Sequence, residues 1–275
     1  MVESSTSYQF TRLEAGVKSR TESIAQAIGV EDPANERWLF VSPHDDDACI
    51  GAGLWIRAAR DAGIDVSILV VTDGRMGYCS VPEKQTIVET RRTETFVSYQ
   101  LLGVEMADIL LVGYPDGGLC RLQGRRDVAP GEAHIANAIG LQNTFTYYLR
   151  QNKPTRVFVA TSTDLHPDHQ ITHTELMISL FHATGEIWSE LGPPLAAMPE
   201  LYEYAVYCDF AQPPNLRLQT DDATFQKKLA AITAFASQRQ IGELVDRIRD
   251  GGPNEYLSEV NFRFYSPKNY QALFE

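Results

Sequence analysis

Four short apolar segments alternate with helical patterns along the chain, and this alternation limits the possible folds more than any other feature of the sequence. Each segment has the length and the β-branched or aromatic content of a buried strand. A strand–helix–strand order predicts right-handed crossovers and therefore an α/β fold around a mainly parallel sheet. The expected strands are 37–43, 66–72, 109–113 and 156–160, and the helical patterns lie at 48–62, 86–102, within 131–151, and from about 171.

The length of 275 residues fits one α/β domain with a single large core. After the four alternating units, a strand at 201–208 and a helix at 222–238 are expected. The expected parts of the domain 1–275 are an N-terminal helical extension over 1–36 with a polar helix at 8–29, a core over about 37–240, and a C-terminal decoration over 241–275.

The charge balance excludes several partners. There are 24 Lys and Arg against 36 Asp and Glu, which gives a net charge of −12. Such a surface repels phosphate backbones, so we expect no nucleic-acid partner.

No apolar run approaches the roughly 18 residues of a membrane span, and no secretory signal is visible at the N-terminus. The four cysteines form no CxxC pair, and a core of this size does not need disulfides, so we expect a cytoplasmic protein. The sequence leaves the oligomeric state open, and a homo-oligomer is one of the alternatives.

Polar and titratable residues gather in the loops that follow the four expected strands. In parallel sheets, ligands bind at the carboxyl ends of the strands, where these loops meet. The sequence therefore predicts one site on one rim of the sheet. The loops are His44–Asp47, 73–78, Tyr114–Gly118 and Asp164–His169.

Three residues in two of these loops have the character of metal ligands. His44 and Asp47 can face one cation, because a tight strand-to-helix turn brings positions three apart together, and His169 adds a third donor. Two imidazoles and one carboxylate with an open position are the ligand set of a catalytic zinc site. Zinc lowers the pKa of a bound water toward about 7, and Asp46 beside it is placed to act as the general base.

Other interpretations of the same residues stay open. An Asp triplet before a helix is often an N-cap that complements the helix dipole. His173 lies one helical turn after His169 and is an alternative ligand, although a supporting position behind the ligands suits it better.

Two motifs together resemble the signature pair of the PIG-L (LmbE-like) zinc-dependent deacetylases. They are Ser42-Pro-His-Asp-Asp-Asp-Ala48 and His166-Pro-Asp-His169. Further segments resemble the family in order and position: Thr72–Gly77, Arg91-Arg-Thr-Glu94 running to Leu102-Gly103, Asp116-Gly-Gly-Leu119, and Lys228 to Ser237-Gln238.

The resemblance implies a Rossmann-like three-layer fold and hydrolysis of an N-acyl group, usually N-acetyl, on a glucosamine-type sugar or glycoconjugate. It implies one zinc ion per chain, held by His44, Asp47 and His169, with Asp46 as the general base. His166 would stabilise the oxyanion of the tetrahedral intermediate or protonate the departing amine. Asp168 would orient a histidine, and Arg91 and Asp116 would contact the substrate, although Asp116 also suits the closing of a Pro-Asp-Gly turn.

The chain departs from the family pattern at three positions. Asp45 replaces the usual proline of the first motif, Ala48 replaces its glutamate, and Arg75 stands where the second loop usually carries glutamate. None of these changes touches a proposed ligand, so they bear on the substrate. Arg75, Tyr78 and the segment to Gln85 are expected to contact the substrate as a distinct lid, for a decorated or acidic sugar.

Two other functions compete with amide hydrolysis. The Asp45-x-Asp47 spacing after a strand is also found in Mg²⁺-dependent phosphatases with an aspartyl nucleophile, but the His166 and His169 pair has no role in that scheme. A non-catalytic glycan-binding protein on the same fold would be expected to lack a metal ligand or the general base. Here the three predicted ligands and the predicted base are all present.

Overall fold

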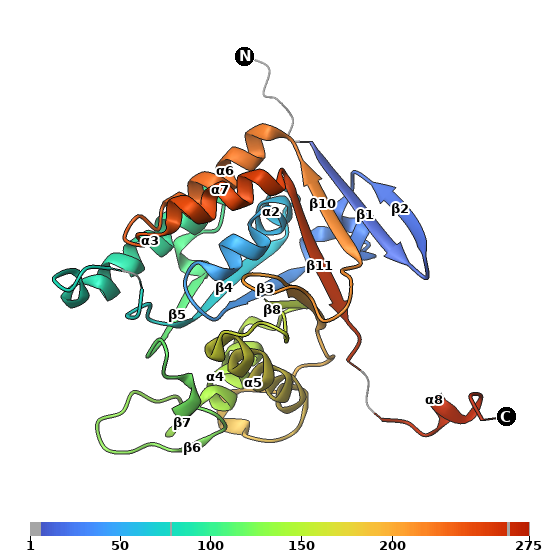
Figure 1. The fold of residues 1–275 in the computed structure, drawn as a ribbon. Coiled ribbons are helices and arrows are strands. Elements are labelled where there is room, and N and C mark those ends of the chain that lie inside the picture. Colours follow the sequence, from blue (N-terminus) through green and yellow to red (C-terminus); the bar gives the residue numbers. More distant parts are fainter. Residues whose placement is uncertain (1–6, 78, 263–264, 275) are drawn as a thin grey trace.

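A computed structural model describes residues 7–77, 79–262 and 265–274 of the protein. Tyr78, part of the predicted lid, lies outside the described residues. The expected α/β class with a large central sheet is confirmed (Figure 1). In the described ranges, nine strands form the main sheet in the order β2-β1-β10-β11-β9-β8-β3-β4-β5.

The parallel half of the sheet contains the four strands predicted from the apolar segments. β3 lies between β4 and β8, and β5 and β9 pair in parallel outside them. The carboxyl ends of these strands therefore lie at one edge, as the predicted site requires. The strands are β3 (Arg37–Ser42), β4 (Asp65–Thr72), β5 (Ile109–Tyr114), β8 (Arg156–Ala160) and β9 (Glu200–Tyr204).

The other half of the sheet is antiparallel and comes from both ends of the chain. β11 pairs with β9, β10 with β11, β1 with β10, and β2 with β1. A small separate hairpin joins β6 (Arg126–Asp127) to β7 (Ala138–Ile139). The antiparallel strands of the main sheet are β1 (Tyr8–Glu14), β2 (Val17–Thr21), β10 (Leu216–Thr220) and β11 (Asn254–Val260).

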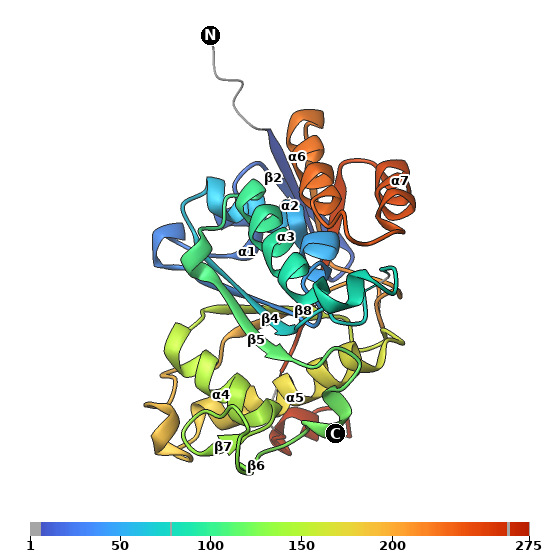
Figure 2. The same cartoon turned by 90° about the vertical axis from the view of Figure 1, so that its left-hand side faces the viewer.

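Helices cover both faces of the sheet and complete three layers (Figures 1 and 2). α2, α3, α6 and α7 lie on one face, and α4 and α5 lie on the other. The helices are α1 (Ile24–Ile28), α2 (Asp47–Asp61), α3 (Ile87–Leu101), α4 (Leu141–Asn152), α5 (Pro167–Thr184), α6 (Asp222–Thr233), α7 (Ile241–Gly251) and α8 (Lys268–Gln271).

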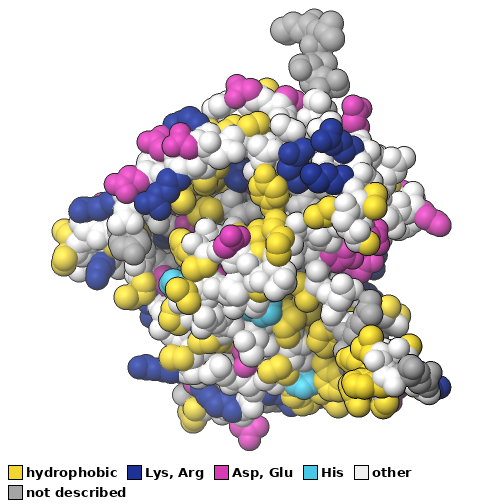
Figure 3. Space-filling model, turned by 45° about the vertical axis from the view of Figure 1, so that its right-hand side comes forward, with side chains coloured by type: hydrophobic (Ala, Val, Ile, Leu, Met, Phe, Trp, Pro, Cys, Tyr) yellow, Lys and Arg dark blue, Asp and Glu magenta, His cyan; other side chains and the backbone are white. Residues whose placement is uncertain are grey.

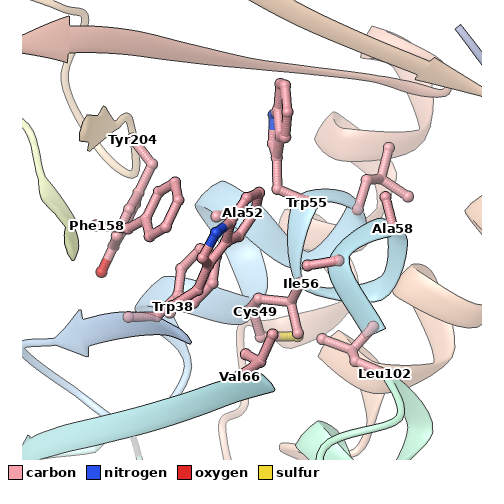
Figure 4. Close-up of a cluster of buried hydrophobic side chains, with 14 of the residues drawn as sticks. Trp38, Cys49, Ala52, Trp55, Ile56, Ala58, Val66, Leu102, Phe158 and Tyr204 are labelled. Atoms are coloured by element: carbon pink, nitrogen blue, oxygen red, sulfur yellow. The ribbon is translucent and has the colours of Figure 1, made fainter. Parts of the chain in front are cut away.

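Alternate residues of the central strand β3 supply two separate cores. Trp38 and Phe40 join the cluster under α2 and α6, and Figure 4 shows Trp38 near Phe158 beside the helix that carries Cys49 and Ala52. Leu39 and Val41 point into the second cluster, under α4 and α5. A strand that is apolar on both faces must be covered on both faces, which explains its unbroken apolar sequence.

The prediction of an N-terminal helical extension was wrong. Residues 8–29 form the hairpin β1–β2 and only a short helix, α1. β1 pairs with β10, more than 200 residues away, from Tyr8 opposite Thr220 to Arg12 opposite Leu216. The local sequence is polar because most of this edge hairpin is exposed, and its only fully buried side chain is Phe10. Pairing with a distant strand therefore overrode the weak helical pattern.

The prediction that residues 241–275 only decorate the core was also wrong. β11 lies inside the main sheet, between β10 and β9, and connects its antiparallel and parallel halves. The helix expected from about residue 171 begins earlier, at Pro167, where the proline occupies the first helical turn. The remaining helices and strands of the expected core are confirmed to within a few residues at most ends.

The helix α2 is interrupted close to the site, and a carboxylate distant in sequence accepts the N–H groups that follow the break. Ala52 has non-helical dihedral angles (φ −141°, ψ 18°). The N–H groups of Leu54 and Trp55, which follow the break, donate to the Glu255 carboxylate of β11 at 2.9 and 3.2 Å. Glu255 also forms a buried ion pair with Lys228 of α6. α2, α6 and β11 are thus fixed to one another by one carboxylate.

The surface in Figure 3 carries basic, acidic and apolar side chains in separate small groups, with a basic group near the top of that face. Within the described ranges, no helix is both long enough and apolar enough to cross a membrane.

Candidate functional site

The loop after β3 is held in a tight turn by its own side chains. Ser42 Oγ accepts the N–H of Ala48 at 3.0 Å, and Oδ2 of Asp47 accepts the N–H of His44 at 2.7 Å. These bonds close the turn and direct the His44 ring and the Asp47 carboxylate to the same side. The spacing of three residues between His44 and Asp47 therefore gives the common orientation that the sequence predicts.

Three atoms of the kind that bind metals converge at the end of β3. Nδ1 of His44 lies 3.0 Å from Oδ2 of Asp47 and 3.1 Å from Nε2 of His169. Nε2 of His169 lies 3.0 Å from the same carboxylate oxygen. All three side chains are buried. The structure brings the three predicted ligands together, and their role as ligands stays a prediction.

The electrostatics of this triangle favour a cation. Burial would raise the pKa of Asp47, but His169 and His44 outweigh it and hold that pKa well below its usual value. Burial opposes the charged form of His44, yet Asp47, Asp116 and Asp168 raise its pKa well above the usual value. In the same way, the pKa of His169 rises to about 9 despite burial. The cluster therefore has an excess of negative potential, which a bound cation would balance.

The donor set and its spacing fit a tetrahedral metal ion. Zinc ligands lie at about 2.0–2.1 Å, so two ligands of a tetrahedral site are about 3.3 Å apart. The three distances of 3.0–3.1 Å are close to this value. In the part of the chain that the structure describes, the buried Oδ1 of Asp47 has no hydrogen-bond donor. A buried carboxylate oxygen without a donor is costly unless a cation lies beside it.

Carboxylates stand behind both histidines. Nε2 of His44, the nitrogen that points away from the triangle, lies 3.1 Å from Asp116 and 3.6 Å from Asp168. Nδ1 of His169 lies 3.1 Å from Oδ2 of Asp164. A carboxylate behind a ligand histidine fixes its ring and its tautomer. The position of Asp168 agrees with the predicted orienting role, whereas Asp116 lies against His44 as well as on the rim.

The loop of Asp116 also forms the turn that its sequence suggests. Gly118 donates its N–H to Pro115 O at 3.0 Å, and Gly117 has φ of +72°, which favours glycine. The other Asp116 oxygen accepts the N–H of Met76 at 3.1 Å. A role for Asp116 in substrate binding stays a prediction.

Asp46 occupies the N-cap position of α2 but caps nothing, which argues against the interpretation of the Asp triplet as a helix cap. Its side chain makes no capping hydrogen bond. Instead Oδ2 accepts a hydrogen bond from Gln238, which lies between α6 and α7, and it is 3.6 Å from Nη2 of Arg91. Asp46 is buried, and it lines the wall of a pocket of about 410 Å³ that His166 also lines.

His166 lines the same pocket, at the start of α5. Its ring centroid is 4.6 Å from that of His44 and 4.9 Å from that of His169. Burial, together with the two neighbouring histidines, lowers the pKa of His166. Nδ1 accepts the N–H of Asp168 at 3.3 Å, so the neutral ring carries its proton on Nε2.

Arg91 is buried and bound to a carboxylate next to the site. Its Nε donates to Asp45 Oδ2 at 2.7 Å, a second bond joins Nη2 to Asp45 Oδ1, and only 2% of the arginine is exposed. Burial, opposed by Arg91, raises the pKa of Asp45 to about 6. Asp45 stands where the family pattern usually has proline. Its carboxylate thus takes up two of the hydrogen-bond donors of the Arg91 guanidinium. Substrate contact by Arg91 stays a prediction.

Two further predicted residues lie outside the metal triangle. Arg75 is exposed and forms an ion pair with Asp73, with Nε 2.8 Å from Oδ2, so its charge is already partly balanced. His173 contacts Glu203 of β9 at 2.8 Å, and the structure does not bring it to the predicted ligands. Substrate binding by Arg75 stays a prediction.

Three residues that lie at the site had no role predicted from the sequence, namely Asp164, Tyr207 and Gln238. Asp164 was inside a motif already singled out, and its distance of five residues from His169 gave no helical or strand spacing to interpret. Tyr207 follows β9, where nothing in the sequence indicated the site, and its ring stacks on His169 at 5.3 Å. Gln238 was noted as part of a family segment, without a contact.

The fold and the site define an α/β protein with a candidate metal centre where parallel strands end. Residues 39–179, just over half of the chain, match the family described as PIG-L, GlcNAc-PI de-N-acetylase. The chain belongs to this family, as the resemblance predicted.

Two related proteins are named as deacetylases. The chain is 28% identical over 166 residues to a 1D-myo-inositol 2-acetamido-2-deoxy-alpha-D-glucopyranoside deacetylase of Kineococcus radiotolerans, covering 54% of this chain and 46% of that protein. It is 36% identical over 87 residues to a diacetylchitobiose deacetylase of Thermococcus kodakarensis, covering 30% and 33%. The matches thus span less than half the length of either relative.

Solved structures show the same fold. The N,N'-diacetylchitobiose deacetylase of Pyrococcus horikoshii superposes with a TM-score of 0.67 at 24% identity, covering 87% of this chain and 89% of that one. A 4-carboxy-2-hydroxymuconate hydratase of Pseudomonas putida gives a TM-score of 0.62 at 18% identity, covering 84% and 98%. Since a hydratase shares the fold, the reaction must be argued from the site.

Proposed function

We propose that the protein is a metal-dependent amide hydrolase that removes an N-acyl group, usually acetyl, from an amino sugar or glycoconjugate. One observation supports this above all: the convergence of His44 Nδ1, Asp47 Oδ2 and His169 Nε2 within 3.1 Å. The names of the two deacetylase relatives agree with it. Zinc is the metal that we propose, with one ion per chain.

Each residue of the site has a role that its position supports. His44, Asp47 and His169 would hold the zinc ion, which would supply the Lewis acidity that polarises an amide carbonyl and acidifies a water. Asp46 lines the pocket and takes the proton of the attacking water. Gln238, which donates to one Asp46 oxygen, leaves the other oxygen free to accept that proton.

His166 acts on the negative charge that develops during the reaction, whereas Asp46 takes a proton. Its Nε2 proton follows from the bond that Nδ1 accepts from Asp168, and an N–H so placed stabilises the oxyanion that develops on the carbonyl or reaches the departing amine. Asp46 then returns the proton that it took from water to the departing amine nitrogen, the C–N bond breaks, and acetate and the free amine leave. Asp164 and Asp168 hold the rings of His169 and His44 in place.

The test is metal analysis of the purified protein together with acetate release from N-acetylglucosamine and N,N'-diacetylchitobiose. Zinc near one per chain and acetate release that Asp46→Asn abolishes are expected. Sugar binding without acetate release would favour the non-catalytic glycan-binding alternative. Mg²⁺-dependent release of phosphate from sugar phosphates would favour the phosphatase. The cytoplasmic location stays a prediction.

A further inference from the structure

Tyr207 stands in the catalytic pocket although no role has been assigned to it. Its backbone N–H donates to Asp164 Oδ2 at 3.2 Å, and its ring stacks on His169 with centroids 5.3 Å apart and planes 27° apart. The same Asp164 carboxylate lies against His169. Two contacts therefore fix Tyr207 relative to the candidate metal site: one through its backbone N–H and one through a face of its ring.

The rest of the tyrosine is open. Tyr207 is 58% exposed, although one face of its ring is covered by His169. It lines the same pocket as Asp46 and His166. An exposed aromatic ring costs free energy in water unless a ligand covers it, and aromatic walls with a few polar groups are typical of ligand pockets. The uncovered ring thus indicates a ligand with a flat apolar face.

The other lining residues fit a ligand that also carries hydroxyl groups. Gln240, which precedes α7, and Glu243 and Arg247 of α7 line the pocket beside Ile241 and Leu244. In the described ranges, the side chains of Gln240, Glu243 and Arg247 make no hydrogen bond or ion pair, so their donors and acceptors are free. A ligand hydroxyl bound by a charged group makes a stronger hydrogen bond than one bound by a neutral group.

An apolar face edged by hydroxyls describes the pyranose ring. We propose that Tyr207 is a substrate-positioning residue whose open ring face stacks on the sugar of the N-acyl amino sugar, while His169 holds its other face. This inference rests on the proposed function for the identity of the sugar. It assigns to Tyr207 a contribution to substrate affinity, because stacking is made equally in the ground state and in the transition state.

The experiment compares the zinc-loaded wild type with Tyr207→Phe and Tyr207→Leu. KM and kcat are measured for acetate release from N-acetylglucosamine, and binding of the product glucosamine is measured as an inhibition constant. Tyr207→Leu is expected to raise KM and the glucosamine inhibition constant by about tenfold with kcat nearly unchanged, while Tyr207→Phe keeps the ring and stays within about twofold. Tyr270→Leu, a change at a tyrosine of α8 that is 50% exposed, is the matched control.

Two results overturn the inference. One is an unchanged KM in Tyr207→Leu. The other is loss of zinc or of thermal stability in Tyr207→Leu, which would make Tyr207 a support for His169 only. A wild type that releases no acetate defeats the proposed function instead. Binding of N-acetylglucosamine, followed by saturation-transfer NMR, then decides on Tyr207 separately, because stacking requires weaker binding in Tyr207→Leu and equal binding in Tyr207→Phe.

Discussion

Oδ2 of Asp164 lies 3.1 Å from Nδ1 of His169, while the other nitrogen of the same ring points to Asp47. Asp164 therefore fixes which nitrogen of His169 is free to bind a metal. We expect Asp164→Asn to weaken zinc affinity by about 10–100-fold, since the amide no longer carries the charge that holds Nδ1–H. Competition with a chromogenic chelator measures the affinity.

The matched control is Asp222→Asn, an exposed carboxylate on α6 that should leave zinc affinity unchanged. Equal zinc affinity in Asp164→Asn and the wild type would contradict the orienting role of Asp164.

Asp46 can be separated from its neighbour Asp47 by one pair of variants. Asp46→Asn is nearly isosteric and should keep zinc while kcat falls about 100-fold or more, because an amide cannot accept the proton of water. Asp47→Asn should lose zinc, since it removes a charged ligand. A near-normal kcat in Asp46→Asn would remove it from the role of general base.

His166 and His169 are three residues apart and are expected to differ in the same way. His166→Ala should retain zinc and lose kcat by about 100-fold, because it removes a hydrogen-bond donor to the developing charge. His169→Ala should lose zinc. If the two variants lose zinc equally, the assignment of His166 to the reaction intermediate is wrong.

Asp116 has three candidate roles that one variant distinguishes: it orients His44, binds substrate or closes the turn. Because Asp116 lies 3.1 Å from Nε2 of His44, we expect Asp116→Asn to weaken zinc affinity about tenfold with the turn intact. The measurements are chelator competition and thermal unfolding. A lower kcat/KM at unchanged zinc affinity would instead support substrate binding, and a large loss of stability would support a role in the turn alone.

The parts of the fold that could be predicted from the sequence are those that local pattern determines. The strand β3 is an unbroken apolar run, and the ligand turn after it follows from the spacing of His44 and Asp47. β1, β10 and β11 were missed because each acquires its strand conformation by pairing with strands that are distant along the chain. Their sequences alone do not contain that information.

The site divides in the same way. The predicted ligands and base could be found because they lie in two short motifs with residue types typical of metal sites. These residues are His44, Asp46, Asp47 and His169. Tyr207 could not be predicted, since its place over His169 depends on the loop after β9, where the Tyr207 N–H bonds to Asp164. The pairing of Arg91 with Asp45 could not be predicted either, because it depends on how α3 packs beside the turn.

Glu255 provides a test of how the site is supported from a distance. It accepts the N–H groups of Leu54 and Trp55 after the break in α2 and pairs with Lys228, and both charged side chains are at most 4% exposed. Glu255→Gln keeps an acceptor for α2 but leaves the Lys228 ammonium buried without a counter-charge. We expect it to lower the free energy of unfolding by about 3–5 kcal/mol, measured by urea denaturation.

Two further variants show whether the buried charge is the cause. Glu259→Gln, on the same strand, breaks a more exposed ion pair with Arg12 and should cost about 1 kcal/mol or less. Lys228→Met combined with Glu255→Gln removes the unpaired ammonium and should recover most of the lost stability, because a buried ion pair is often replaced by apolar atoms at little cost. If the double variant is as unstable as Glu255→Gln, the loss comes from the hydrogen bonds to α2 and not from the charge.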